Sequence, residues 1–113
     1  MKKIKVYIAG KVTGEPVAEC TMKFGVAQKE IEALGYEAVN PLEVVGSFNV
    51  TWEEAMRKCI KALMDCDAIL LLPDASQSKG ANVEMNLVYS LQMPFYNTTK
   101  ELEKDCLELK LAH

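Results

Sequence analysis

The feature that most constrains this chain is a repeated alternation between strand-like and helix-like patterns. Four short apolar segments, at residues 4–9, 36–40, 67–72 and 93–97, are typical of strands. Helical patterns are predicted over 17–34, from Thr51 to about Met64, from the polar loop 73–80 to about Leu91, and over 98–111. Strands that alternate with helices in this way predict a parallel sheet with helices on both of its faces.

The predicted architecture is a single α/β domain spanning residues 1–113, with four parallel strands in the order 2-1-3-4. The third predicted strand is apolar throughout, which is typical of a strand buried on both faces. In such sheets, ligands bind beyond the carboxyl ends of the strands, where the winding direction reverses. The candidate site therefore lies between residues 9–14 and residues 73–84.

Composition narrows the chemistry that such a site could perform. The one histidine is His113, the last residue, so catalytic triads and zinc sites that need histidine are excluded, and no metal or cofactor is expected. Four cysteines without a CxxC pair predict reduced thiols and a cytoplasmic location. The 13 basic and 16 acidic residues argue against nucleic acid as a partner. No apolar run reaches the roughly 18 residues that a membrane span requires.

The first candidate segment is the loop that follows the first strand, which contains Gly10, Lys11, Thr13 and Gly14. It leads into a helix N-terminus, whose free amides favour phosphate or another anion. The loop matches neither the P-loop pattern nor the dinucleotide-binding pattern. An ordinary strand-to-helix turn that needs glycine for its backbone angles explains it equally well.

The second candidate segment runs from Ser78 to Glu84, and Gly80 is expected to allow a tight turn into a helix. In the first turn of that helix, the dipole would lower the pKa of Glu84. An ionised carboxylate beside an apolar pocket suits nucleophilic attack on carbon, as in glycosyl transfer. A carboxylate that only interacts with the helix dipole is the simpler alternative, and spacing alone favours it.

Three further residues near this edge of the sheet are possible functional residues. Tyr7, near the end of the first strand, could place its hydroxyl against a ligand or against an internal partner. Asp74, in the polar loop, contributes only if it faces the crevice. Cys59 lies on the apolar stripe of the second predicted helix and is interpreted as a buried, inert thiol.

Four segments together resemble the nucleoside 2-deoxyribosyltransferase-like superfamily, and within it a small domain family frequent in bacteria and their phages. They are Lys5–Gly10 (KVYIAG), Asn40-Pro41, Cys66–Pro73 (CDAILLLP) and Ser78–Glu84 (SKGANVE). The resemblance covers roughly residues 3–97. It implies a three-layer, flavodoxin-like (Rossmann-like) fold and homo-oligomers in which neighbouring subunits complete the active sites.

The resemblance also implies an activity, cleavage of the N-glycosidic bond of deoxynucleosides or their monophosphates. Glu84 matches the family's nucleophile, and Tyr7 matches a first-strand tyrosine that orients it. Ser78 occupies the place of a serine that helps to hold the 5′-phosphate in related monophosphate hydrolases. Cys59 departs from the pattern, because transferases usually carry there an aspartate that contacts or protonates the base.

The leading expectation is therefore a deoxyribosyltransferase or a deoxynucleoside 5′-monophosphate N-glycosidase that binds a small-molecule nucleoside or nucleotide. Glu84 and Tyr7 are its expected catalytic pair. The expected substrate contacts are Gly10, Lys11, Thr13, Gly14, Asp74, Ser78 and Gly80. The alternatives are a catalytically inactive nucleotide-binding or sensing module, and a small oligomeric scaffold whose last helix packs through Leu102, Cys106 and Leu109.

Overall fold

A computed structural model describes residues 3–107 and contains one parallel sheet of four strands. The strands are β1 (Lys5–Ala9), β2 (Glu37–Val39), β3 (Ala68–Leu71) and β4 (Phe95–Tyr96). Their spatial order is β2-β1-β3-β4, and every neighbouring pair is parallel. The predicted strand order is confirmed, although the fourth strand is shorter than the predicted segment 93–97.

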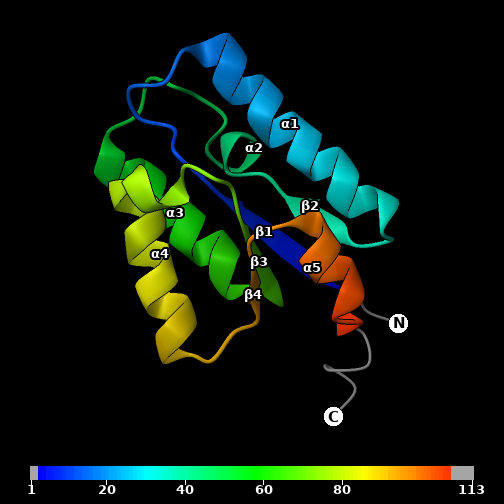
Figure 1. Ribbon diagram of the computed structural model, residues 1–113. Helices are drawn as coiled ribbons and strands as arrows, with labels where there is room; N and C mark the ends of the chain where they lie inside the picture. Colours follow the sequence, from blue (N-terminus) through cyan, green and yellow to red (C-terminus); the bar gives the residue numbers. More distant parts are fainter. Residues whose placement is uncertain (1–2, 108–113) are drawn as a thin grey trace.

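The helices form a layer on each face of the sheet (Figure 1). On one face lie α1 (Val17–Ala33) and α5 (Thr99–Lys104), and on the other lie α3 (Trp52–Met64) and α4 (Lys79–Ser90). The protein is thus a three-layer, flavodoxin-like α/β fold, as predicted.

The two faces of β1 supply the two halves of the core. Val6 and Ile8 pack with Phe24 of α1, whereas Tyr7 packs on the opposite face with Leu63 of α3. This alternation is the ordinary period of a strand. Full burial of each large apolar side chain contributes about 1.5–3 kcal/mol. The same period directs the Tyr7 side chain towards the helix pair α3 and α4.

The helix ends follow local signals in the sequence. Thr51 and Thr98 are N-caps whose hydroxyl oxygens accept hydrogen bonds from the amides of Glu54 and Glu101. Gly35 has a φ of +92° directly after α1, where a left-handed residue commonly ends a helix. The predicted starts of α3 and α5 and the predicted end of α1 are therefore correct.

One helix, α2 (Pro41–Val45), was not predicted. The sequence pattern predicts only a strand over residues 36–40, which ends directly before Pro41. In the structure the Asn40 side chain accepts from the amide of Leu42, Pro41 begins the helix, and Gly46 closes it with a φ of +76°. Proline at the first helical position needs no amide partner, so the same residue ends a strand and starts a helix.

The last helix differs from its predicted extent of 98–111. It ends at Lys104, Cys106 adopts a φ of +47°, and Leu107 returns to the core. A continuous helix would point Leu102 and Leu107 about 140° apart, so both are buried only because the chain turns between them. Cys106 is exposed and does not share the buried face of Leu102, which corrects that part of the prediction. Residues 108–111, including Leu109, lie outside the described residues.

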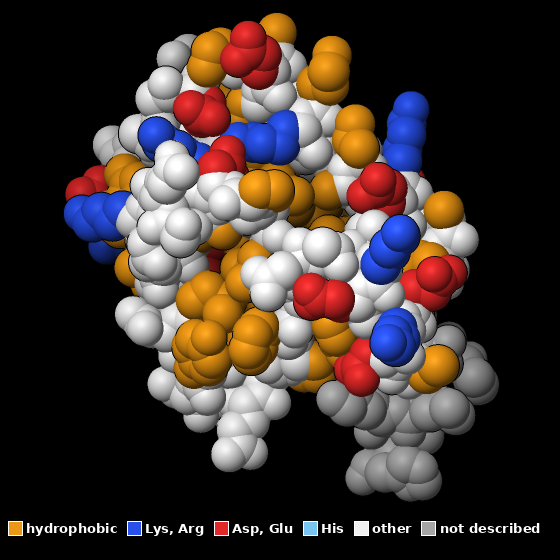
Figure 2. Space-filling view, viewed as in Figure 1, with side chains coloured by type: hydrophobic (Ala, Val, Ile, Leu, Met, Phe, Trp, Pro, Cys, Tyr) orange, Lys and Arg blue, Asp and Glu red, His pale blue; other side chains and the backbone are white. Residues whose placement is uncertain are grey.

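Figure 2 shows basic and acidic side chains interspersed over one face of the molecule. Hydrophobic side chains gather there near the end of α4, where Tyr89, Leu91 and Phe95 are exposed. The rings of Tyr89 and Phe95 form an edge-to-face pair with their centroids 5.1 Å apart. None of the helices within residues 3–107 combines the length and the apolar character needed to cross a bilayer.

Candidate functional site

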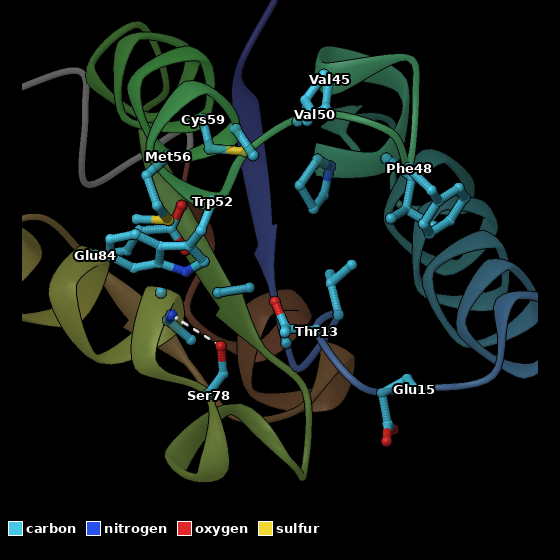
Figure 3. A pocket seen from close by; sticks show the side chains of 18 of the residues that line it. Thr13, Glu15, Val45, Phe48, Val50, Trp52, Met56, Cys59, Ser78 and Glu84 are labelled. Atoms are coloured by element: carbon cyan, nitrogen blue, oxygen red, sulfur yellow. Dashed lines mark hydrogen bonds between the residues drawn. The ribbon is translucent and has the colours of Figure 1, made fainter.

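A cavity of about 370 Å³ opens at the carboxyl end of β1, on the side of the sheet that carries α3 and α4 (Figure 3). Its lining comes from residues 7–10 and 12–15, from α2 and the segment that joins it to α3, from the first two turns of α3, and from the first two turns of α4. This is the position beside β1 and β3 where the winding of the sheet reverses, as predicted.

The innermost polar groups of the cavity are Glu84 of α4 and Tyr7 of β1. The Tyr7 hydroxyl donates a hydrogen bond of 2.7 Å to Oε2 of Glu84, whose side chain is almost completely buried. Among the described residues Tyr7 is the one hydrogen-bonding partner of this carboxyl group, and no lysine or arginine pairs with it. The carboxyl group is therefore positioned by a phenol alone while it faces the cavity.

The pKa of Glu84 differs from its prediction. Burial raises this pKa to about 7, and the hydrogen bond from Tyr7 offsets only part of that effect. The predicted lowering fails because α4 begins at Lys79, which places Glu84 in the second turn, beyond the amides of the helix start. Burial and the nearby Glu84 charge raise the pKa of Tyr7, so its hydroxyl keeps its proton. The pair therefore holds a protonated phenol beside a carboxyl group whose pKa is raised into the neutral range.

Ser78 and Gly80 border the cavity at the start of α4. The Ser78 hydroxyl oxygen accepts from the amide of Ala81 as the helix N-cap and still has its own proton to donate to a ligand. Gly80 lies inside the helix rather than in a tight turn, which corrects its predicted role. A Cβ atom at Gly80 would lie 2.8 Å from Sδ of Met56, so the glycine allows the close approach of α3 and α4.

The loop after β1 places Gly10, Thr13 and Gly14 on the cavity. A Cβ atom at Gly10 would lie 2.8 Å from Cδ1 of Leu72 and 3.1 Å from Cζ of Phe24, so packing requires this glycine. Gly14 has a φ of +83°, which favours glycine for conformational reasons. Both glycines have a structural role and also border the cavity.

Lys11 and Asp74, also predicted as substrate contacts, are not among the lining residues. Asp74 accepts hydrogen bonds from the Lys11 amide at 3.0 Å and from Nζ of Lys23 at 2.6 Å. Lys23 also donates to the carbonyl oxygen of Lys11 at 2.7 Å. Burial alone would raise the pKa of Asp74, but these hydrogen bonds outweigh it and hold that pKa below its usual value. Asp74 and Lys23 thus form a clasp between the loops that follow β1 and β3.

The apolar wall of the cavity was missed by sequence analysis. It consists of side chains from α2, the following loop and the start of α3, namely Leu42, Val45, Phe48, Val50, Trp52 and Met56. Trp52 and Met56 fall on the apolar stripe of α3, a pattern that does not distinguish core residues from a cavity wall. The Asn-Pro pair that begins α2, with Gly46 five residues after Pro41, was the available signal that a helix covers this side.

Cys59 also lines the cavity and is buried beside the catalytic candidates. Burial raises the pKa of its thiol, although a hydrogen bond with Tyr7 acts in the opposite direction. The group is therefore a protonated thiol at neutral pH. Within the part of the chain that the structure describes, no group of three or more histidine, cysteine, aspartate or glutamate side chains could hold a metal ion.

Comparison with known proteins identifies one family. The model of the family described as Domain of unknown function (DUF4406) matches residues 4–96, which include all four strands and every residue of the cavity lining. No curated protein matches the chain.

Proposed function

The chain belongs to the DUF4406 family, and we propose that it is an enzyme that cleaves the N-glycosidic bond of a 2′-deoxynucleoside or its 5′-monophosphate. The single observation that carries this proposal is the buried Glu84 carboxyl group, which faces a ligand-sized cavity and is held by Tyr7. Cavities of a few hundred cubic ångströms are typical of small-molecule sites.

Glu84 is the proposed nucleophile. Because its carboxylate accepts one hydrogen bond and pairs with no cation among the described residues, its lone pairs are less stabilised than those of a salt-bridged carboxylate. The sugar carbon C1′ of a nucleoside carries developing positive charge as the base departs. A carboxylate beside such a centre stabilises that charge and can bond to it.

The proposed reaction has two steps. An oxygen of Glu84 forms a bond to C1′ while the C1′–N bond breaks, and the bonding electron pair leaves with the base. Water then attacks C1′ and the carboxylate of Glu84 is released. The water oxygen and one of its protons become the hydroxyl of the sugar, and the other proton goes to the freed base. Tyr7 keeps the attacking carboxylate in one orientation throughout, because its hydroxyl remains protonated. A second base in place of water would make the protein a transferase.

The sugar and its phosphate are assigned to the polar side of the cavity. Figure 3 shows Ser78 and Thr13 on this side, below Glu84 in the view. Their hydroxyl groups, with the first amides of α4, are suitable donors to sugar and phosphate oxygens. Among the described residues, the lining contains no lysine or arginine side chain, so amides and hydroxyls would carry the recognition.

The test is release of free base from the four common deoxynucleosides and their 5′-monophosphates, followed by chromatography. Glu84→Gln should reduce base release by about 10³-fold or more and leave ligand-dependent thermal stabilisation intact. Glu53→Gln, a change at an exposed glutamate of α3, is the matched control and should act like the wild type. Mass spectrometry of the quenched reaction should find the sugar attached to the peptide that contains Glu84.

A nucleotide-sensing module is the second candidate, and Cys59 favours it. The resemblance leads one to expect an aspartate at this position, and a protonated thiol is a poor substitute for that acid. Ligand-dependent stabilisation without base release from any substrate would support sensing and contradict the enzyme. Absence of both effects would contradict both proposals.

A further inference from the structure

The cavity divides into a polar side and an apolar side, and this division bears on how the departing base is held. In Figure 3 the side chains of Val45, Val50 and Phe48 lie across the cavity from Glu84. Trp52 and Met56 lie next to Glu84 on the side of α3. With the sugar and phosphate on the polar side, as the proposed function assigns them, the base must lie against this apolar wall.

No side chain on the apolar wall has the donor and acceptor pattern that reads the edge of a base. Throughout residues 3–107, the cavity lining contains no asparagine, glutamine, histidine, aspartate, lysine or arginine. The nearby hydroxyls of Ser47 and Thr51 accept from the amides of Asn49 and Glu54, so each keeps one proton to donate, but neither presents the paired donor and acceptor of an amide side chain. Recognition of one base among several requires paired hydrogen bonds to its edge.

The apolar wall also lacks an acid that could protonate the base as it leaves. The lining has two carboxyl groups, and Glu84 is the proposed nucleophile. The other belongs to Glu15, which pairs with Lys23 at 3.4 Å and points away from the cavity in Figure 3. The remaining candidate, the thiol of Cys59, is a weak donor that holds its proton tightly.

Trp52 offers a surface on which any base could stack. Its indole lines the cavity at the start of α3, and Nζ of Lys79 lies 4.3 Å from the centroid of its ring. This cation–π contact ties the first residues of α3 and α4 together and restrains the ring. Stacking on an aromatic side chain tolerates every base, because each base has a π-face.

We infer that the leaving base is held mainly by packing and stacking, without paired hydrogen bonds to its edge and without an acid to protonate it. The substrates are therefore 2′-deoxynucleosides or their 5′-monophosphates whose bases depart readily, whichever base they carry. This inference rests on the proposed function. During the first step the electron pair of the C1′–N bond leaves on the base nitrogen, which takes its proton from water.

The experiment compares 2′-deoxyuridine 5′-monophosphate with its 5-fluoro derivative, or the two parent nucleosides if the phosphate is not required. The two bases have almost the same size, but fluorine withdraws electrons and makes the base a better leaving group. Without acid assistance, kcat should be at least about tenfold higher for the fluorinated substrate while KM changes little. Equal kcat values would overturn the inference and leave the proposed function intact. No base release from either compound would contradict the proposed function and this inference together.

The Trp52 variants test the stacking half of the inference. Trp52→Ala should raise KM about tenfold for a purine and a pyrimidine substrate alike, and Trp52→Phe, which keeps a smaller aromatic face, should raise it less. Glu53→Gln, at the exposed neighbouring residue, is the control and should stay near the wild type. Wild-type KM values for the two classes should agree within about tenfold, since no edge is read. A KM defect confined to one base, or a strong preference for one base in the wild type, would show that its edge is recognised and would overturn the inference.

Discussion

Tyr7 and Glu84 stand 77 positions apart in the chain, yet the hydroxyl of the first lies 2.7 Å from Oε2 of the second. The period of β1 turns Tyr7 towards α3 and α4, and the helical phase of α4 turns Glu84 back towards β1. The contact thus joins the central strand of the sheet to the helix that follows the winding reversal. The first two predictions concern this pair.

Tyr7→Phe should shift the pH dependence of catalysis. The hydrogen bond from Tyr7 lowers the pKa of Glu84, so its removal should raise that pKa further. Because attack requires the ionised carboxylate, the acidic limb of the kcat profile should move to higher pH by the same amount. Tyr89→Phe, which removes an exposed hydroxyl, is the control. An unchanged limb in Tyr7→Phe would contradict the assigned role of the phenol.

Glu84→Gln should change how stability depends on pH. The pKa of Glu84 is about 7 in the folded state, against 4.5 for a glutamate in the unfolded chain, so between these values the folded state binds more protons than the unfolded state. The free energy of unfolding therefore falls as the pH rises through this window. Above pH 7, ionisation of Glu84 should lower it by about 3 kcal/mol.

Urea denaturation at pH 5 and pH 8 measures this effect. The fall in the free energy of unfolding between the two pH values should be smaller in Glu84→Gln than in the wild type or in Glu53→Gln. An equal fall in the free energy of unfolding in all three proteins would show that the carboxyl group is already ionised in the folded state at pH 5.

Gly10→Ala and Gly80→Ala should differ in their effect on stability, although each new Cβ would meet an atom at 2.8 Å. At Gly10 the neighbours are Leu72 and the buried ring of Phe24, which should cost about 1–3 kcal/mol. At Gly80 the neighbour is the flexible end of Met56, and alanine favours a helix by about 1 kcal/mol, so the net change should be small. Displaced Met56 should, however, weaken ligand binding. Urea denaturation measures the two changes in stability, and ligand-induced thermal shifts measure binding. Equal destabilisation by the two substitutions would contradict the predicted difference.

Asp74→Asn should weaken the Asp74–Lys23 clasp between the loops that follow β1 and β3, and should leave the cavity lining unchanged. The partly buried ion pair with Lys23 should contribute about 1 kcal/mol, part of which high salt should remove. Since the pKa of Asp74 is held below its usual value, this stability is present above pH 4 and is lost as the pH falls below it. A double-mutant cycle with Lys23→Met measures the coupling, and a coupling energy of zero would contradict the clasp.

Cys59→Asp should supply an acid where the resemblance leads one to expect it. For a substrate with a poor leaving base, kcat should rise by about 10²-fold, while an activated substrate should gain little. Cys59→Ser, which adds no acid, is the control. The variant should lose stability, because a second carboxyl group is buried near Glu84. Similar gains for both substrates would show that the new side chain acts otherwise than as an acid.

The sequence by itself determined the order of the sheet and most of the helix ends. These features depend on local patterns, since a fully apolar run such as Ile69–Leu72 favours a buried parallel strand and Thr51 or Thr98 can cap only the helix that follows it. Parallel strands with helical crossovers leave few topologies, and the winding reversal then locates the cavity beside β1. This reasoning made Glu84 a candidate, whereas the expected roles of Tyr7 and Ser78 came from the family resemblance.

Only the tertiary structure decided which groups share an environment. The pKa of Glu84 follows from its burial against Tyr7, a contact between distant segments that no local spacing encodes. Trp52 and Met56 carry the pattern of core residues and become cavity wall because α2 and its loop leave space beside them. Asp74 pairs with Lys23 instead of lining the cavity, which is a second contact between distant segments. The solvent exposure of a side chain and the groups that it contacts depend on how distant segments pack around it, so local sequence patterns do not encode them.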